Sequence, residues 1–175
     1  MTIRSFLAAF TVGLFLSTGH SGVALAHSEH LKTLSITGLW ARATPPRAQA
    51  AGGFLTIENT GTETDRLVDA NSPIAGRVEI HEMAMNDGVM TMRALTEGIE
   101  IPAGDSITLA PGGVHIMFMD LKDGFTEGSP VAMTLVFENA GEIEVSLPVL
   151  GLGAKGPAMK VMEHDHGTSD TGSKQ

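Results

Sequence analysis

The 175-residue sequence contains no cysteine and no tyrosine, and its only tryptophan is one of few aromatic residues. Without cysteine the chain cannot form disulfide bonds, so its stability must come from a packed core. The same absence excludes thiolate zinc sites and blue-copper centres, in which two histidines and one cysteine bind the copper. Any metal bound by this chain must therefore use nitrogen, oxygen or thioether donors.

Basic residues are also scarce, with 11 Lys and Arg against 20 Asp and Glu and a formal net charge of −9. An acidic chain is a poor partner for nucleic acid or for an anionic lipid surface, so we expect no nucleic-acid binding. The sequence shows no nucleophile motif, phosphate-binding loop or paired-carboxylate signature. These absences give no support to hydrolytic chemistry.

The N-terminus is typical of a secretory signal peptide. Arg4 precedes the apolar run "FLAAFTVGLFLSTG", and a small-x-small site, "ALA", ends at Ala26. The run is short and interrupted by Gly and Ser, which argues against a membrane span, although a retained anchor is the alternative. We expect residues 1–26 to be removed, leaving a periplasmic protein that begins at His27 and has no membrane span.

Short apolar-polar alternating segments fill the rest of the chain up to about residue 150. Most are bounded by Gly, Pro, Asn or Asp, as strands are, and no amphipathic helix or internal repeat is evident. The expected strands are "LSITGLWARA", "GGFLTIENTG", "RLVDA", "GRVEIHEMAM", "GVMTMRAL", "SITLAPGG", "VHIMFMDL", "PVAMTLVFENAG" and "EIEVSLPVL". This pattern predicts an all-β domain over 27–150, an antiparallel β-sandwich or Greek-key barrel of 8–9 strands. Residues 151–175 are predicted to form a flexible tail.

Three of these strands concentrate methionine on one face. Side chains two residues apart on a strand share a face, and "NDG" at 86–88 predicts a hairpin between the first two strands. The histidines and methionines that share such faces are His81, Met83 and Met85, then Met90 and Met92, and finally His115, Met117 and Met119.

Methionine alone usually indicates core packing, but the two histidines favour a binding site. A buried imidazole costs roughly 1–3 kcal/mol unless its nitrogens have partners, and Leu, Ile or Val would pack without that cost. Imidazole and thioether together form a soft, neutral ligand set that suits Cu(I) and is poor for Ca²⁺ or Mg²⁺. We therefore expect a His₂Met₂ site for Cu(I), suited to binding and transfer.

The spacing of these residues resembles the signature of the PCuAC family of periplasmic copper(I) chaperones, His-x10-Met-x21-His-x-Met. Ten residues separate His81 from Met92, twenty-two separate Met92 from His115, and one separates His115 from Met117. Because the second spacing is one residue longer, Met90, which shares strand parity with Met92, is an alternative ligand. The segments "WARATPPRAQAAGGFLTIENTG", "GIEIPAGDSITLAPGGVHIMFMDL" and "GSPVAMTLVFENAG" extend the resemblance over most of the mature chain.

The resemblance implies a cupredoxin-like β-sandwich that carries Cu(I) and is not an enzyme. The copper acceptor would be the Cu(A) centre in subunit II of cytochrome c oxidase, or another copper chaperone. The implied ligands are His81, Met92, His115 and Met117. Met83, Met90 and Met119 would pack around the site or act as auxiliary ligands. A copper-scavenging or resistance protein is the alternative function.

Both ends of the mature chain carry donors for a second copper. Tail imidazoles beside carboxylates suit Cu(II), and an N-terminal histidine can chelate Cu(II) through its amino group and ring. These donors are Met159, Met162, His164 and His166 in the tail, and His27 at the start. A copper oxidase built on His27 is a further, less favoured function; otherwise both ends are ordinary solvated termini.

Overall fold

The computed structural model describes residues 28–86 and 88–157, and this part of the chain is all-β. Its strands are β1 (Glu29–Leu31), β2 (Leu34–Arg42), β3 (Ala50–Asn59), β4 (Asp65–Asn71), β5 (Ala75–Asn86), β6 (Val89–Ala94), β7 (Ile99–Ile101), β8 (Ser106–Leu109), β9 (Val114–Leu121), β10 (Pro130–Phe137) and β11 (Gly141–Leu150). Among the described residues no helix is long and apolar enough to cross a membrane.

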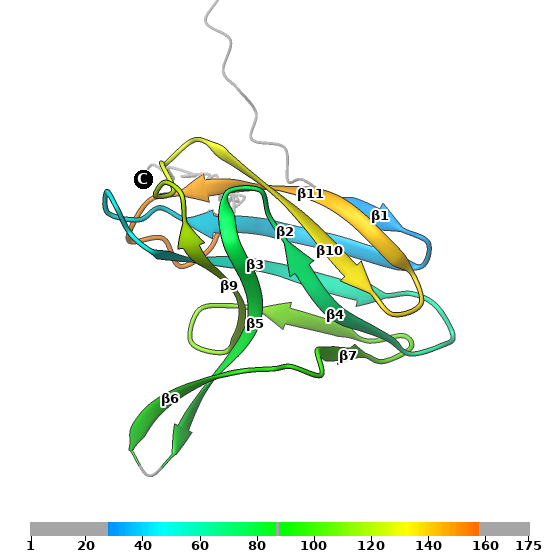
Figure 1. Cartoon of the computed structure of the whole chain (residues 1–175). Coiled ribbons are helices and arrows are strands. Elements are labelled where there is room, and N and C mark those ends of the chain that lie inside the picture. Colours follow the sequence, from blue (N-terminus) through cyan, green and yellow to red (C-terminus); the bar gives the residue numbers. More distant parts are fainter. Residues whose placement is uncertain (1–27, 87, 158–175) are drawn as a thin grey trace, which may run out of the picture.

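The strands form two layers that share one continuous path of pairing (Figure 1). One layer has the order β6-β5-β9-β3-β2, with β1 beside β2 and β8 beside β3, and the other has the order β11-β10-β4-β7. The path does not close, because β6 and β7 are its two ends. The two layers join where the end of β11 pairs in parallel with β2, Val149 opposite Ala41 and Leu150 opposite Arg42.

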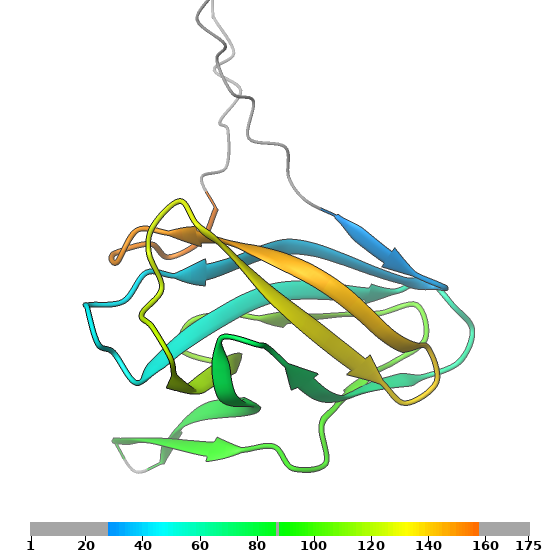
Figure 2. The same ribbon diagram turned by 45° about the horizontal axis from the view of Figure 1, so that its top comes forward.

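The core lies between the two layers and is filled by the inward face of each strand. Ile116 and Phe118 of β9 are fully buried, and the Phe118 ring meets Phe125 edge-on at 5.1 Å between centroids. A Cβ on Gly53 of β3 would lie 2.8 Å from the Phe118 ring and 3.1 Å from Leu147 of β11. This glycine therefore allows the layers to approach closely, as Figure 2 shows where β10 and β11 lie over β2 and β3.

The predicted all-β sandwich is confirmed, and all nine expected strands are present. The described residues contain two further strands, β1 and β7, which the sequence pattern missed because each has only three residues. One pair of strands departs from the predicted antiparallel arrangement, since β11 and β2 pair in parallel. β2 and β11 lie near the two ends of the domain, and the alternation of apolar and polar residues within each strand does not indicate the direction in which the two strands pair.

Candidate metal site

Two histidines from adjacent strands face each other on the outward side of the β5–β9 pair. His81 of β5 lies directly opposite His115 of β9, with 6.1 Å between ring centroids and an interplanar angle of 72°. Their chain neighbours Ile80 and Ile116 point into the core, so the imidazoles are on the outer face. Both are nevertheless buried, His81 at 8% exposure and His115 at 6%.

One nitrogen of each imidazole is already engaged. The Nε2–H of His81 donates to Oε2 of Glu79 at 2.7 Å, and the Nδ1–H of His115 donates to the carbonyl oxygen of Gly113 at 3.0 Å. Carboxylate and carbonyl oxygens accept and do not donate, so these contacts place the proton on the bonded nitrogen. When the two imidazoles are neutral, the nitrogens left with a lone pair are Nδ1 of His81 and Nε2 of His115.

The Nδ1 atom of His81 is buried and has no hydrogen-bond partner. Among the described residues it is the sole buried side-chain nitrogen or oxygen in that state. Leaving such an atom unpaired costs roughly 1–3 kcal/mol, and a site of this kind calls for an explanation, such as an ion that binds there. The unpaired lone pair is the strongest sign that this imidazole is built to bind a ligand.

The methionines of β9 extend the same outer face beyond the histidines. Met117 lies opposite Glu79 on β5 and opposite Gly52 on β3. It is two residues beyond His115 on the same face of β9, and Met119 is two residues further. Diagonal neighbours across an antiparallel pair are roughly 7–8 Å apart at Cα, within reach of a long side chain. Met117 is therefore a neighbour of both histidines, whereas Met119 is remote from His81.

The hairpin of β5 and β6 brings further methionines to this face. Met83 lies opposite Met92, and Met85 lies opposite Met90. The predicted hairpin is confirmed, and Figure 1 shows its end projecting from the sandwich. Met92 is one diagonal step from His81, whereas Met90 is two residues, or roughly 7 Å, further along the strand.

An aromatic cluster borders the histidine pair on the side of β2 and β3. The Phe54 ring lies 6.5 Å from the His115 ring, and the Trp40 ring lies 4.4 Å from Phe54. The Arg42 guanidinium covers both rings at 5.5 and 5.7 Å, and its Nε donates to the carbonyl oxygen of Ala154. This cluster contributes to the burial of His115 on one side, and electrostatic interactions are stronger where water is excluded.

Sequence reasoning missed Glu79 and the aromatic cluster as parts of this site. The available signal for Glu79 was its place two residues before His81, on the same face of the strand. Trp40 and Phe54 carry a weaker signal, because their contact with each other depends on the register of two strands. That register shifts at a bulge between Thr37 and Trp40.

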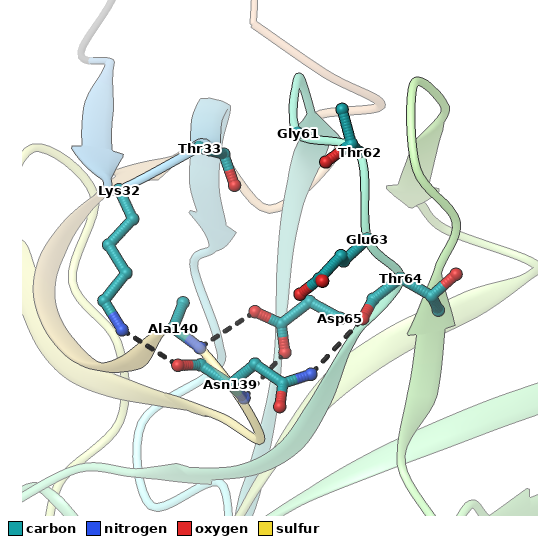
Figure 3. A pocket seen from close by; sticks show the side chains of 9 residues that line it. All are labelled: Lys32, Thr33, Gly61, Thr62, Glu63, Thr64, Asp65, Asn139 and Ala140. Atoms are coloured by element: carbon teal, nitrogen blue, oxygen red, sulfur yellow. Dashed lines mark hydrogen bonds between the residues drawn. The ribbon is translucent and has the colours of Figure 1, made fainter.

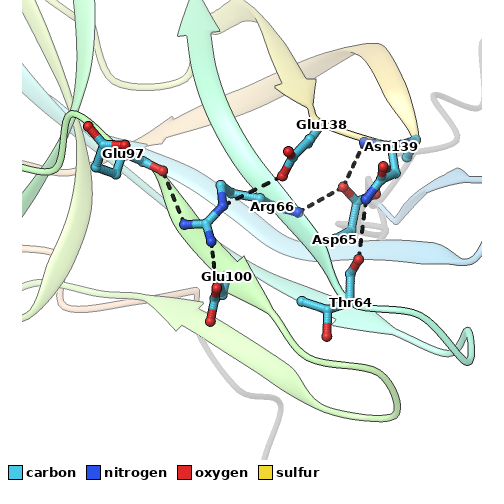
Figure 4. Close-up of polar contacts among 8 residues, drawn as sticks. Thr64, Asp65, Arg66, Glu97, Glu100, Glu138 and Asn139 are labelled. Carbon is cyan, nitrogen blue, oxygen red and sulfur yellow. Dashed lines mark hydrogen bonds and ion pairs between the residues drawn. The ribbon is translucent and has the colours of Figure 1, made fainter.

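A separate hollow of about 280 Å³ contains none of these residues (Figure 3). Asp65 borders it and accepts hydrogen bonds from the backbone N–H groups of Arg66, Asn139 and Ala140. Beside it, Arg66 binds Glu100 and Glu138 and donates to the carbonyl oxygen of Glu97 (Figure 4). These contacts join the start of β4 to the turn after β10 and so stabilise that turn.

No three His, Asp or Glu side chains gather to hold a metal ion anywhere in 28–86 and 88–157. The donors beside the histidine pair are the methionine thioethers and the Glu79 carboxylate. The second predicted copper site lies outside the described residues, and so do the predicted signal peptide and most of the tail. Its predicted donors are His27, Met159, Met162, His164 and His166.

Several solved structures with this fold are PCuAC domains, the family that the spacing of the histidines and methionines resembles. The apo PCuAC domain from PmoF1 is 30% identical and covers 71% of this chain and 99% of its own, with a TM-score of 0.61. The copper-bound PCuAC domain from PmoF2 is 26% identical over 71% of this chain and 98% of its own, also at 0.61. CuI-DR1885 from Deinococcus radiodurans is 26% identical over 73% and 83%, at 0.53.

The fold thus defines a domain of the PCuAC class, and the predictions of this class and of a cupredoxin-like sandwich are confirmed. The chain belongs to the LpqE-like family, whose model, described as "Putative lipoprotein LpqE-like", matches residues 34–149. A relative in Leifsonia xyli subsp. xyli, "Putative lipoprotein Lxx21020", is 35% identical over 116 residues, which are 66% of this chain and 69% of the relative.

Proposed function

We propose that this protein is an exported, non-enzymatic copper carrier that binds one Cu(I) on the outer face of the β5–β9 pair. The observation that carries the proposal is the buried, unpaired Nδ1 of His81 beside the lone pair of His115. The copper-bound PmoF2 domain and CuI-DR1885 share the fold and support the choice of metal. The ligands we propose are His81, Met92, His115 and Met117.

The donor set suits the proposed cargo. Two neutral imidazoles and two thioethers are soft ligands that favour Cu(I) over hydrated Cu(II), Ca²⁺ or Mg²⁺. Met92 is half exposed at the edge strand, so an incoming ligand can displace it before the buried histidines release the metal. We propose ligand exchange of this kind with an acceptor, either the Cu(A) centre in subunit II of cytochrome c oxidase or another copper chaperone.

We also propose a periplasmic location, after removal of a signal peptide at Ala26. The family description and the Leifsonia relative's name both say lipoprotein, which agrees with export. The 175 residues contain no cysteine, so they offer no thiol for attachment of a lipid. Mass spectrometry of the protein isolated from a periplasmic fraction would test both points, and an N-terminus other than His27 would contradict the cleavage site.

The decisive experiment is an anaerobic Cu(I) titration against a competing chelator. The chain from His27 should bind one Cu(I) at this site, and the double variant His115→Ala/Met117→Ala should lose affinity by more than the roughly 10–100-fold that follows loss of an outer partner. The matched control is His30→Ala/Met85→Ala, which also removes one histidine and one methionine, both on exposed positions away from the histidine pair.

The control should bind as the unmodified chain does. Equal binding by all three proteins would overturn the ligand assignment. No binding by any of them would overturn the copper proposal itself.

A further inference from the structure

We propose that Glu79 is a positioning residue for copper binding, which holds His81 in the tautomer that presents Nδ1 to the metal. His81 would then bind through Nδ1 and His115 through Nε2. The inference rests on the proposed Cu(I) function, but its first test is made on the metal-free protein.

Glu79 contacts His81 with one carboxylate oxygen and lies near Arg77 with the other. It lies on the outer face of β5, two residues before His81, and its Oε2 accepts the His81 Nε2–H at 2.7 Å. Its other oxygen, Oε1, lies 3.6 Å from Nη1 of Arg77, and Arg77 in turn lies 3.3 Å from Oδ2 of Asp120 on β9. Of the two carboxylate oxygens, Oε2 is therefore the one that makes a short hydrogen bond, and that bond is to the imidazole.

This contact selects one of two imidazole tautomers. A neutral imidazole carries its proton on either nitrogen, and a carboxylate hydrogen-bonded at Nε2 stabilises the form with the proton there. The lone pair then belongs to Nδ1, the atom that is buried without a partner. Because the tautomer is set before the metal arrives, the lone pair already lies on the buried nitrogen when Cu(I) binds.

The partner histidine has its tautomer set by different means. The Nδ1–H of His115 donates to the backbone carbonyl of Gly113, a group that no side-chain substitution removes. Metal-binding histidines commonly donate their second N–H to a carboxylate or a carbonyl, and loss of such a partner lowers metal affinity by roughly 10–100-fold. Of the two orienting groups, only the one on His81 is therefore open to a direct test by substitution.

The test uses Glu79→Ala and Glu79→Gln, with Glu82→Ala as the matched control. Glu82 is also on β5, its side chain is 33% exposed against 34% for Glu79, and it also pairs with an arginine, Arg93. It lies on the opposite face of the strand. Two-bond ¹⁵N–¹H correlation spectra of the metal-free proteins report which nitrogen of His81 carries the proton.

We expect the proton on Nε2 in the unmodified protein and in Glu82→Ala, and a mixture of tautomers in Glu79→Ala. Glu79→Gln should keep the Nε2–H form, because its amide oxygen still accepts. A purely structural role would not move this signal. A proton on Nδ1 in the unmodified protein, or an unchanged spectrum in Glu79→Ala, would overturn the inference.

The second measurement is Cu(I) affinity by chelator competition. We expect Glu79→Ala to lose roughly 10–100-fold, Glu79→Gln to lose less, and Glu82→Ala to match the unmodified protein. On loading, the ¹⁵N shift of His81 Nδ1 should move while Nε2 keeps its proton. Glu79→Ala binding as tightly as Glu82→Ala would overturn the positioning role. Failure of the unmodified protein to bind Cu(I) would instead overturn the proposed function, and the tautomer spectra would still decide the contact.

Discussion

At the scale of single residues, Met90 and Met92 are similarly exposed but lie at different positions relative to His81. Both are on β6, both point to the methionine-bearing face, and they are 52% and 50% exposed. They differ in register, because Met92 lies opposite Met83, next to His81, whereas Met90 lies opposite Met85 near the hairpin end. Sequence spacing left either methionine as the ligand, and the register favours Met92.

We predict that Met92→Leu weakens Cu(I) binding by about tenfold or more, whereas Met90→Leu leaves it nearly unchanged. Leucine keeps a similar apolar volume and removes the thioether, so the two substitutions differ in chemistry only if one sulfur binds the metal. Chelator competition on both variants is the measurement. A larger loss of Cu(I) affinity in Met90→Leu would show that Met90 is the ligand. Equal small losses would show that β6 contributes no ligand.

The positions of some side chains could be predicted from the sequence, and those of others could not. Period-two alternation correctly placed His81, Met83 and Met85 on one face, because it depends only on strand geometry. The same rule makes outer-face side chains polar and exposed, yet Trp40 and Phe54 are each 4% exposed there. Their burial depends on contacts between segments far apart in the sequence, such as Trp40 against Phe54 and Arg42 against Ala154, and local pattern does not report those contacts.

At the scale of elements, the β5–β6 hairpin connects the candidate site to β6, an edge strand with few stabilising contacts. Every described side chain of β6 is exposed, and β6 pairs with a strand on one side only. The Glu82–Arg93 pair across the hairpin is exposed and contributes little. The "NDG" segment made this hairpin predictable, since Gly88 takes a φ of 81°, a left-handed value that glycine adopts readily.

We predict that Cu(I) slows amide hydrogen exchange in β6. An edge strand with exposed side chains opens with little free energy in the metal-free protein, so its amides should exchange faster than those of β9. A metal bound to β5, β6 and β9 binds only the closed hairpin and stabilises it by mass action. Exchange measured by mass spectrometry, with and without Cu(I), checks this. The control peptides are those of β10 and β11, and slowing equal in all peptides would contradict a local effect.

At the scale of the whole molecule, the sandwich places the core and the candidate metal site on opposite faces of the same strands. The inner faces of the two layers form one core that includes Ile116, Phe118 and Leu147. The candidate ligands of β5 and β9 lie on the other face of the same strands. The parallel pairing of β11 with β2 joins the two layers, and it could not be predicted from the sequence because the two strands lie at opposite ends of the domain.

The final prediction compares neighbours on β9, Phe118→Ala and Met119→Ala. Phe118 is fully buried against Phe125 and Gly53, so its truncation should lower the free energy of unfolding by about 3–5 kcal/mol. Met119 is half-buried on the outer face, and its truncation should cost about 1 kcal/mol or less. Urea denaturation followed through Trp40 fluorescence measures both. Equal losses would mean that the outer face contributes to the core, and that stability and metal binding are not divided between the two faces.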